Sequence, residues 1–314
     1  MKLIVNLKLY LILLALSGLV SLLFFAESNL FPSRSWQYAW NLGHIPLFIM
    51  VGYAVFHFFC VIHEKSLLNQ VLLLASIAFF SGAFIEYLQT FVGRQASLQD
   101  VMLDVTGSVI SVALFSNRIR MLSFRKKAFT AFLVISLILF VSWKLMSSLW
   151  DEYQARSDFP VLADFEHARE INRWTSIEKI EISDEVSKLG LKSLKLTLTP
   201  RTYSGVELQY FPGDWSGYRR FGLHVFYSEA GPIFLTVSIF DNKHHANRYS
   251  FTDRYTKSFQ LQPGWNAVNI SLDDVKHAPQ KREMDMTRIR GLRLFVVRPG
   301  KMQHIYIDGV RLEN

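Results

Sequence analysis

The sequence is poor in cysteine and in charged residues. Its 314 residues include one cysteine, Cys60, which excludes an intrachain disulfide framework and a cysteine-rich metal site. Charged residues make up 19% of the chain, whereas soluble domains carry about 25%. Hydrophobic residues reach 50% and the mean hydropathy is +0.19. Collagenous and disordered classes are therefore excluded, and a membrane component is expected.

The charge is distributed unevenly along the chain. Residues 1–150 contain 11 Lys and Arg against 5 Asp and Glu, whereas residues 151–314 contain 23 against 21. A net charge of +8 could indicate a nucleic-acid partner. However, many of the excess basic residues lie beside apolar segments, where they are explained by the orientation of the chain in a bilayer. We therefore expect an apolar membrane half (1–150), with lipid as its partner, and a polar half of about one domain.

The apolar half contains several segments of membrane-spanning length. A spanning helix needs about 20 mostly apolar residues. Five segments approach this length and predict a transmembrane α-helical bundle: residues 9–26, 45–62, 71–88, 101–115 and 128–149. The first is favoured as a retained anchor rather than a cleaved signal peptide. Phe24 stands where cleavage after Ala26 would need a small residue.

Basic residues between these segments predict the orientation. Lys and Arg accumulate in cytoplasmic loops, and the loop after the fourth segment holds Arg118, Arg120, Arg125, Lys126 and Lys127. With four spans before it, a cytoplasmic loop there also places the N-terminus in the cytoplasm. The fifth span then carries everything after Trp150 to the outer side.

In this topology seven polar side chains fall at the outer end of the helices: His44, Glu86, Gln89, Arg94, Ser97, Asp100 and Asp104. Glu86 and Gln89 share one side of a helix, and so do Asp100 and Asp104. Ionisable groups at membrane depth mostly face a bundle interior or a hydrated cavity, so their convergence predicts a ligand-binding or catalytic site. The alternative is that Arg94 neutralises Glu86 or Asp100 only to hold a helical hairpin.

The stretch EYLQTFVGRQASLQDVMLDVTG, residues 86–107, resembles the signature of VanZ-like membrane proteins, and the resemblance extends over about residues 5–120. In that family a Glu-x-x-Gln helix end is followed by Arg, Ser and Asp, then by Asn and Gly in the next helix, and an earlier helix begins with His, as at His44. Asp104 stands where the family usually has Asn, and Thr106 replaces a small residue. The resemblance implies a bacterial cytoplasmic membrane and an effect on glycopeptide-antibiotic susceptibility.

The second half has a different pattern. Residues 151–160 are a polar stretch that predicts a linker, and residues 161–314 contain short alternating runs broken by turn residues, which is typical of an all-β domain. About nine strands predict a jelly-roll sandwich. Phrases such as DWSGY (214–218), PGWN (263–266) and IYIDGVRL (305–312) resemble those of galactose-binding-like jelly rolls found in carbohydrate-binding modules.

The resemblance directs attention to the loop that begins at residue 241. Amides, imidazoles and guanidinium groups hydrogen-bond sugar hydroxyls, and exposed tyrosines stack on pyranose faces. The candidate glycan-binding residues are Asp241, His245, Asn247, Arg248, Tyr249, Arg254 and Tyr255. The alternative is a solvated hairpin tip, with Trp174, Trp215 and Trp265 all in the core. The pair His244-His245 is a poor metal motif, since neighbours on a strand face opposite sides.

A structural calcium site is a separate expectation. Asp164 and Glu166 would share a strand face, and the jelly-roll resemblance would bring Asp308 of the last strand beside the first. Carboxylate oxygens are the ligands that Ca²⁺ prefers. The alternative is that Asp308 pairs with a basic neighbour or caps a turn.

These patterns favour a non-enzymatic envelope protein that recognises a glycan or a lipid-linked glycan precursor. The alternative is a membrane enzyme acting on a polyprenyl-phosphate type substrate at the outer leaflet, with acid–base work by the membrane carboxylates and His44 and with Arg94 holding a phosphate. The sequence has no nucleophile elbow, zinc motif or phosphate-binding glycine loop. A transporter is disfavoured because five spans show no internal repeat. The ligand and the oligomeric state stay open.

Overall fold

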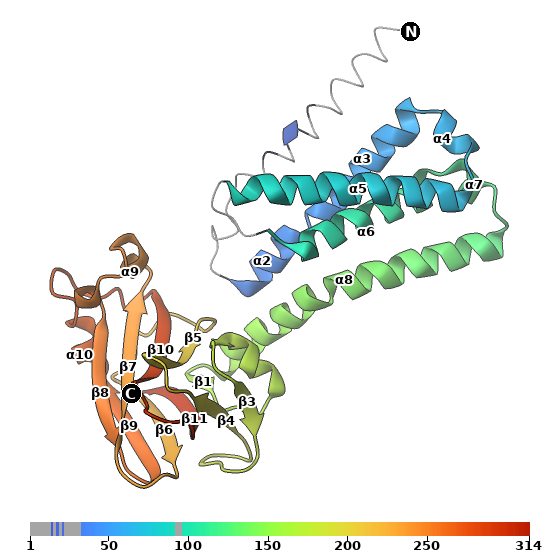
Figure 1. Ribbon diagram of the computed structural model, residues 1–314. Coiled ribbons are helices and arrows are strands. Elements are labelled where there is room, and N and C mark those ends of the chain that lie inside the picture. Colours follow the sequence, from blue (N-terminus) through green and yellow to red (C-terminus); the bar gives the residue numbers. More distant parts are fainter. Residues whose placement is uncertain (1–13, 15–16, 19–20, 22–32, 92–95) are drawn as a thin grey trace. The chain divides into compact units, whose positions relative to one another are not determined.

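The computed structural model describes residues 33–91 and 96–314, together with Leu14, Ser17, Gly18 and Ser21. It divides into two compact units, Met1–Leu149 and Trp150–Asn314, whose elements are labelled in Figure 1. Apart from those four residues, the predicted span 9–26 lies outside the described residues, and so does Arg94.

The first unit is helical throughout its described part. Its helices are α2 (Arg34–Asn41), α3 (His44–Phe58), α4 (Val61–Glu64), α5 (Leu67–Thr90), α6 (Leu98–Phe115), α7 (Asn117–Arg120) and α8 (Phe124–Asp158). Four stretches are long and apolar enough to cross a membrane: Arg34–Phe58, Leu67–Thr90, Leu98–Phe115 and Phe124–Asp158. They correspond to the last four predicted spans, with ends that differ by several residues.

Serine side chains begin several of these helices. Ser66 precedes α5, Ser97 precedes α6 and Ser116 precedes α7, and each hydroxyl accepts a hydrogen bond from a backbone N–H of the first turn. This capping satisfies a donor that the helix itself leaves free. These serines therefore fix where α5, α6 and α7 start, which the hydropathy of the apolar runs alone did not define.

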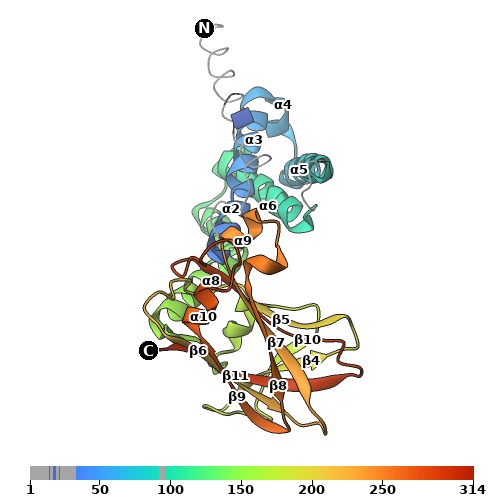
Figure 2. The same cartoon turned by 90° about the vertical axis from the view of Figure 1, so that its left-hand side faces the viewer.

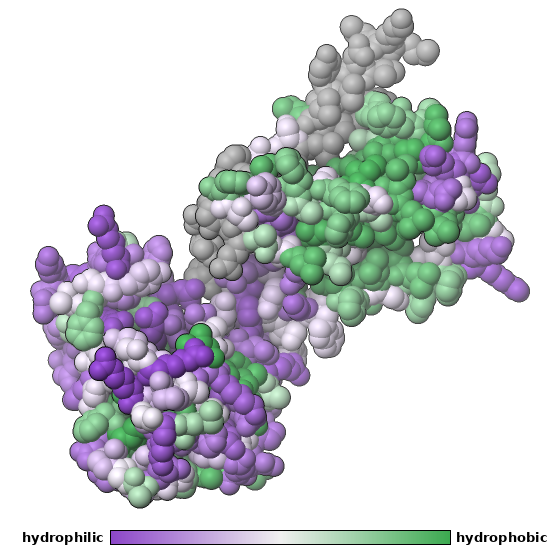
Figure 3. Space-filling view, viewed as in Figure 1, coloured by the Kyte–Doolittle hydropathy of each residue, from purple (hydrophilic) through white to green (hydrophobic). Residues whose placement is uncertain are grey.

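Small residues allow α6 to pack closely against both α3 and α5 (Figure 1). A Cβ at Gly107 would contact the carbonyl of Ile45 on α3, and a Cβ at Gly82 would collide with the Asp104 carboxylate. Close approach through glycine is a common way to pack membrane helices. Many large hydrophobic side chains of these helices are exposed, and most of the helical surface seen in Figure 3 is apolar. None of the most hydrophobic window of α8 is buried, which is expected of a helix surrounded by lipid.

The predicted linker at 151–160 is replaced for most of its length by helix. The α8 helix continues to Asp158, because residues 124–158 contain no glycine or proline to end it and the first breaker is Pro160. The last turns belong to the second unit. There Asp151 is buried and accepts hydrogen bonds from Nε and Nη2 of Arg173, at 3.1 and 2.9 Å.

The second unit is a β-sandwich of two antiparallel sheets, as predicted (Figure 2). One sheet has the order β3-β4-β11-β6-β9, with β1 paired to β11; the other has the order β2-β5-β10-β7-β8. The strands are β1 (Val161–Ala163), β2 (Trp174–Thr175), β3 (Ile180–Ser183), β4 (Ser193–Leu198), β5 (Tyr203–Leu208), β6 (Arg220–Tyr227), β7 (Ile233–Asp241), β8 (Tyr255–Leu261), β9 (Gly264–Ser271), β10 (Ile289–Val297) and β11 (Gln303–Glu313). Short helices lie between them: η2 (Ala168–Arg173), α9 (Lys243–Ala246), η3 (Phe251–Asp253) and α10 (Leu272–Lys276).

The alternation of side chains along the strands builds the sandwich core. Leu292, Leu294 and Val296 of β10 are buried in it, while the residues between them face the other side of the sheet. Trp174 and Trp215 are buried, as the structural interpretation of these residues expected, and Trp265 is half-buried. One face of the sheet β2-β5-β10-β7-β8 therefore holds the core, and its opposite face is free to form a surface groove.

Candidate functional sites

The helical unit gathers four of the predicted polar side chains at one place. His44 is the first residue of α3, and its Nδ1 lies 2.8 Å from Oδ1 of Asp104 on α6. Both side chains are buried. Because a carboxylate only accepts hydrogen bonds, Nδ1–H of His44 is the donor. This contact fixes the orientation of the ring and leaves Nε2 as the nitrogen that can accept a proton or bind a ligand.

Glu86 and Asp100 complete this group. Together with His44 they offer ligand atoms that all lie within 4.8 Å of one another, and all three residues are buried. Glu86 lies near the end of α5, and its Oε2 accepts a 2.7 Å hydrogen bond from the backbone N–H of Ser97, the residue that caps α6. We call His44, Glu86, Asp100 and Asp104 the membrane cluster.

The other predicted members lie near this cluster or outside the description. Gln89 is buried on α5, three residues after Glu86. Ser97 connects the two helices through its backbone, and Arg94 is not among the described residues. One imidazole with three carboxylates suits acid–base chemistry or cation binding. Such groups within apolar helices are costly, which is why they commonly mark functional sites.

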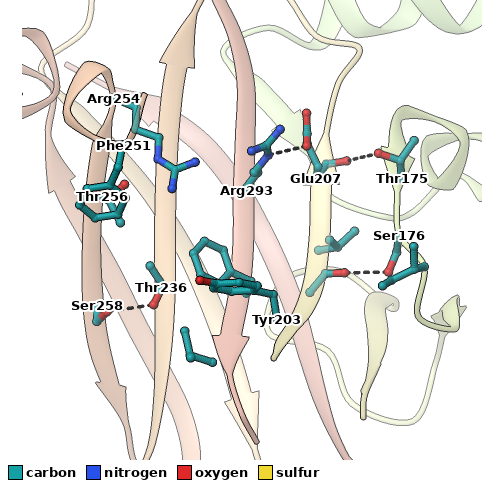
Figure 4. A pocket seen from close by; sticks show the side chains of 15 residues that line it. Thr175, Ser176, Tyr203, Glu207, Thr236, Phe251, Arg254, Thr256, Ser258 and Arg293 are labelled. Atoms are coloured by element: carbon teal, nitrogen blue, oxygen red, sulfur yellow. Dashed lines mark hydrogen bonds and ion pairs between the residues drawn. The ribbon is translucent and has the colours of Figure 1, made fainter. Parts of the chain in front are cut away.

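A second candidate site lies on the outward face of the five-stranded sheet. A groove of about 840 Å³ runs over β2, β5, β10, β7 and β8. Figure 4 shows its lining side chains: Thr175, Ser176, Ile177, Tyr203, Gly205, Val206, Glu207, Thr236, Phe251, Arg254, Thr256, Ser258, Arg293, Phe295 and Val297. Gly205 lies opposite Phe295 in the register, and a Cβ there would collide with Phe295. The glycine therefore keeps the floor of the groove open beside this ring.

Aromatic rings and hydroxyl groups both line the groove. Tyr203 is 63% exposed and packs edge-on against Phe295, with ring centroids 5.7 Å apart. The Thr236 and Ser258 hydroxyls lie 2.9 Å from each other on neighbouring strands. Ligand sites typically combine such apolar surfaces with a few placed polar groups.

Two arginines lie at the same end of the groove (Figure 4). Arg293 donates from Nε to Glu207 at 2.6 Å, whereas Arg254 packs over the ring of Phe251, with its guanidinium carbon 5.1 Å from the ring centroid. Burial lowers the pKa of the Arg254 guanidinium, and the positive charge of Arg293 lowers it further. The Arg254 guanidinium nevertheless stays charged at neutral pH.

Of the seven candidate glycan residues, the structure places Arg254 in the groove. Asp241 is buried and accepts hydrogen bonds from Arg282, including one of 2.8 Å from Nη2. Tyr255 faces the core. Four others lie outside the groove lining, in α9 or directly after it, a stretch (residues 243–249) that we call the α9 segment: His245, Asn247, Arg248 and Tyr249. The pair His244-His245 lies in the helix α9, and not on a strand as expected from the sequence. His244 is buried and His245 is exposed.

The groove residues that the sequence did not single out have a recognisable pattern. On β10 the outward positions are Arg293, Phe295 and Val297, where a strand facing only water would carry small polar residues or lysine. An arginine and an aromatic ring on the free face of a strand are therefore a signal of a binding surface that the sequence contained. The strand order that brings Tyr203 of β5 beside them could not be read from the sequence.

Of the predicted calcium arrangement, the last strand β11 does lie beside the first strand β1, but Asp164 and Glu166 are placed differently from the prediction. Oδ2 of Asp308 accepts from the backbone N–H groups of Lys188 and Leu189, at 2.6 and 2.8 Å. Oε1 of Glu166 accepts from two amides of the same loop. Asp164 and Glu166 follow β1 and do not share a strand face, because Phe165 between them has a φ of 61°. In the described chain, the ligand atoms gathered at metal-like spacing are those of His44, Glu86 and Asp100. Calcium binding stays a prediction.

Residues 7–123 match the family model of VanZ/LLP1 proteins. The VanZ/LLP1 match includes the whole membrane cluster. No curated protein matches the chain.

Solved structures similar to part of the chain include an exo-beta-agarase, at 15% identity and a TM-score of 0.40, over 49% of this chain and 24% of the agarase. The family 11 carbohydrate-binding module from Clostridium thermocellum in complex with a beta-1,3-1,4-mixed-linked tetrasaccharide has 16% identity and a TM-score of 0.37, over 49% of this chain and 94% of the module. The CBM22-2 xylan-binding domain of Paenibacillus barcinonensis Xyn10C has 19% identity and a TM-score of 0.35, over 48% and 96%.

Proposed function

We propose that this protein is a bacterial membrane protein that binds a cell-envelope glycan, or a lipid-linked glycan precursor, in the groove of its C-terminal sandwich. The observation that carries the proposal is the groove itself, with an exposed aromatic ring beside hydroxyl, carboxylate and guanidinium groups. Its volume of about 840 Å³ lies within the usual range of ligand sites, about 300–1,000 Å³. In this proposal the groove recognises its ligand and catalyses no reaction.

The aromatic and the polar residues of the groove have different roles in the proposed recognition. Tyr203 offers a flat apolar face to a sugar ring, and hydrogen bonds hold the polar residues around it in place. Ser176 donates from Oγ to the carbonyl of Gly205 at 2.7 Å, and Arg293 holds Glu207. Side chains that are already ordered lose less conformational entropy when a ligand binds.

The proposed orientation places this groove outside the cell. The basic residues of the α6–α8 connection are expected to stay in the cytoplasm, so the C-terminal end of α8 lies at the outer surface. There a glycan-binding domain meets envelope polymers and lipid-linked precursors. Altered access to such precursors would explain an effect on glycopeptide-antibiotic susceptibility.

The test is binding of envelope and plant polysaccharides to the full chain in detergent micelles, measured by calorimetry and on a glycan array. Tyr203→Ala should weaken binding roughly three- to tenfold, as expected for loss of one aromatic contact. Tyr249→Ala is the matched control, because this tyrosine is also exposed, at 54%, but belongs to the α9 segment. Weaker binding in Tyr249→Ala together with unchanged binding in Tyr203→Ala would move the site to the α9 segment. If the parent chain binds no glycan, the proposal is refuted.

A second function is supported by the membrane cluster. The ring of His44 is oriented by Asp104, with Glu86 and Asp100 close by, as a general base would be. This arrangement favours a membrane enzyme acting on a lipid-linked substrate at the outer leaflet. Turnover of a radiolabelled polyprenyl-diphosphate sugar by the purified chain, lost in His44→Gln but retained in Tyr203→Ala, would support the enzyme. Absence of turnover would leave the cluster as a binding or structural site.

A further inference from the structure

The two arginines of the groove are unequally neutralised. Arg293 has a carboxylate partner, Glu207, at 2.6 Å, and its guanidinium also packs over the ring of Phe240, 4.8 Å from the centroid. Arg254 forms no ion pair with any carboxylate in the described part of the chain. The groove therefore carries one positive charge in excess at this end.

The surroundings of Arg254 make that charge costly. Its Nε is buried and has no hydrogen-bond acceptor among the described residues, and the side chain is partly shielded from water by the ring of Phe251. The charge of Arg293 acts on it unfavourably. A buried donor without an acceptor destabilises a protein. A ligand that supplies a negatively charged oxygen here would both accept a hydrogen bond from Nε and neutralise the excess positive charge.

We infer that the groove selects a glycan that bears an anionic substituent, a carboxylate or a phosphate, bound at Arg254. This inference rests on the proposed glycan-binding function and adds the ligand class to it. The guanidinium fork matches the geometry of both oxyanions. Tyr203 and the hydroxyls farther along the groove bind the sugar ring, and Glu207 keeps Arg293 partly neutralised, so Arg254 provides the charge selection.

The test uses full-length protein in detergent micelles and two pairs of matched probes. One pair is oligogalacturonate and its carboxyl-reduced, neutral counterpart; the other is a phosphomannan oligosaccharide and its dephosphorylated form. In each pair the sugar backbone stays the same and the charge is removed. We expect the acidic member of at least one pair to bind roughly ten- to a hundredfold more tightly, and which pair responds tells carboxylate from phosphate.

Substitutions locate the charge recognition. Arg254→Gln should bring the affinities for the acidic and neutral members within about twofold, while Arg254→Lys should keep a reduced preference because it keeps the charge without the fork. Arg220→Gln is the matched control. Arg220 lies on β6 in the other sheet and its side chain is 59% exposed, so its loss removes the same charge and should leave the preference intact. An equal effect of Arg220→Gln would overturn the assignment to Arg254.

The outcomes separate this inference from the function on which it rests. Equal binding of acidic and neutral members by the parent chain would refute the anionic class and support glycan binding. Polyglutamate bound as tightly as the acidic sugars would refute glycan recognition and support an anion site. Failure to bind any of the four probes, or any glycan of the array, would refute both.

Discussion

Two substitutions at Asp104 should separate two contributions to the stability of the helical unit: the hydrogen bond with His44 and the negative charge of the carboxylate. Asp104→Asn keeps an oxygen that can accept from Nδ1–H of His44, and the amide has nearly the size of the carboxylate. Asp104→Ala removes the acceptor altogether. We therefore expect the asparagine variant to fold nearly as well as the parent chain, and the alanine variant to be clearly destabilised.

The size of the difference follows from burial. Both residues are at most 7% exposed and the contact is 2.8 Å long. Hydrogen bonds between membrane helices stabilise by about 0.6 kcal/mol on average and by up to about 1.7. Leaving the His44 donor buried without an acceptor adds about 1–3 kcal/mol. Asp104→Ala should thus cost about 2–5 kcal/mol, and Asp104→Asn less than about 1 kcal/mol.

The assay is thermal unfolding of the full chain in detergent, followed as the fraction that elutes as a folded species after heating. Gly82→Ala is a useful companion, because the added methyl group would collide with the Asp104 carboxylate and should lower the unfolding midpoint without removing any charge. If Asp104→Asn unfolds as early as Asp104→Ala, the charge and not the hydrogen bond stabilises the helices. If Asp104→Ala unfolds like the parent chain, the contact with His44 contributes nothing.

Four further expectations can be checked independently. Glu86→Gln and Asp100→Asn should keep normal abundance in the membrane but lose the effect on envelope-antibiotic sensitivity; normal sensitivity at normal abundance would contradict a functional role of the cluster. A reporter active only in the cytoplasm should be silent when fused after Asn314, and activity would reverse the topology. The pKa of Asp253 is lowered to about 2 by hydrogen bonds from Arg282. About 2 kcal/mol of stability, fully present above the ordinary pKa near 4, should be lost as the pH falls from 4 to 2, and Asp253→Asn should flatten that part of the stability curve. If the three predicted ligands hold calcium, chelation should lower the melting temperature of the sandwich, whereas an unchanged curve would dismiss the metal.

Much of the fold was predictable because its signals are local. Twenty-residue apolar runs indicate spanning helices wherever they occur, and the short alternating runs of residues 161–314 indicated an all-β domain. The end of α8 was not predicted, since a polar sequence such as residues 151–158 is equally compatible with helix and linker. Its continuation is stabilised by the contact of Asp151 with Arg173, which is 22 residues away in the sequence.

The two candidate sites differ in how much of each could be predicted from the sequence. In a membrane, successive helices must begin and end at alternate surfaces, so the positions of His44, Glu86 and Asp100 along the chain already required them to lie at the same level. A sandwich imposes no such rule. The groove depends on the order β2-β5-β10-β7-β8, in which the pairs β2–β5, β5–β10 and β10–β7 are not consecutive in the sequence. The sequence predicted Arg254 only as one polar residue of a loop. Its position near Arg293 makes it a candidate for binding an anion, and that position depends on the assembled sheet.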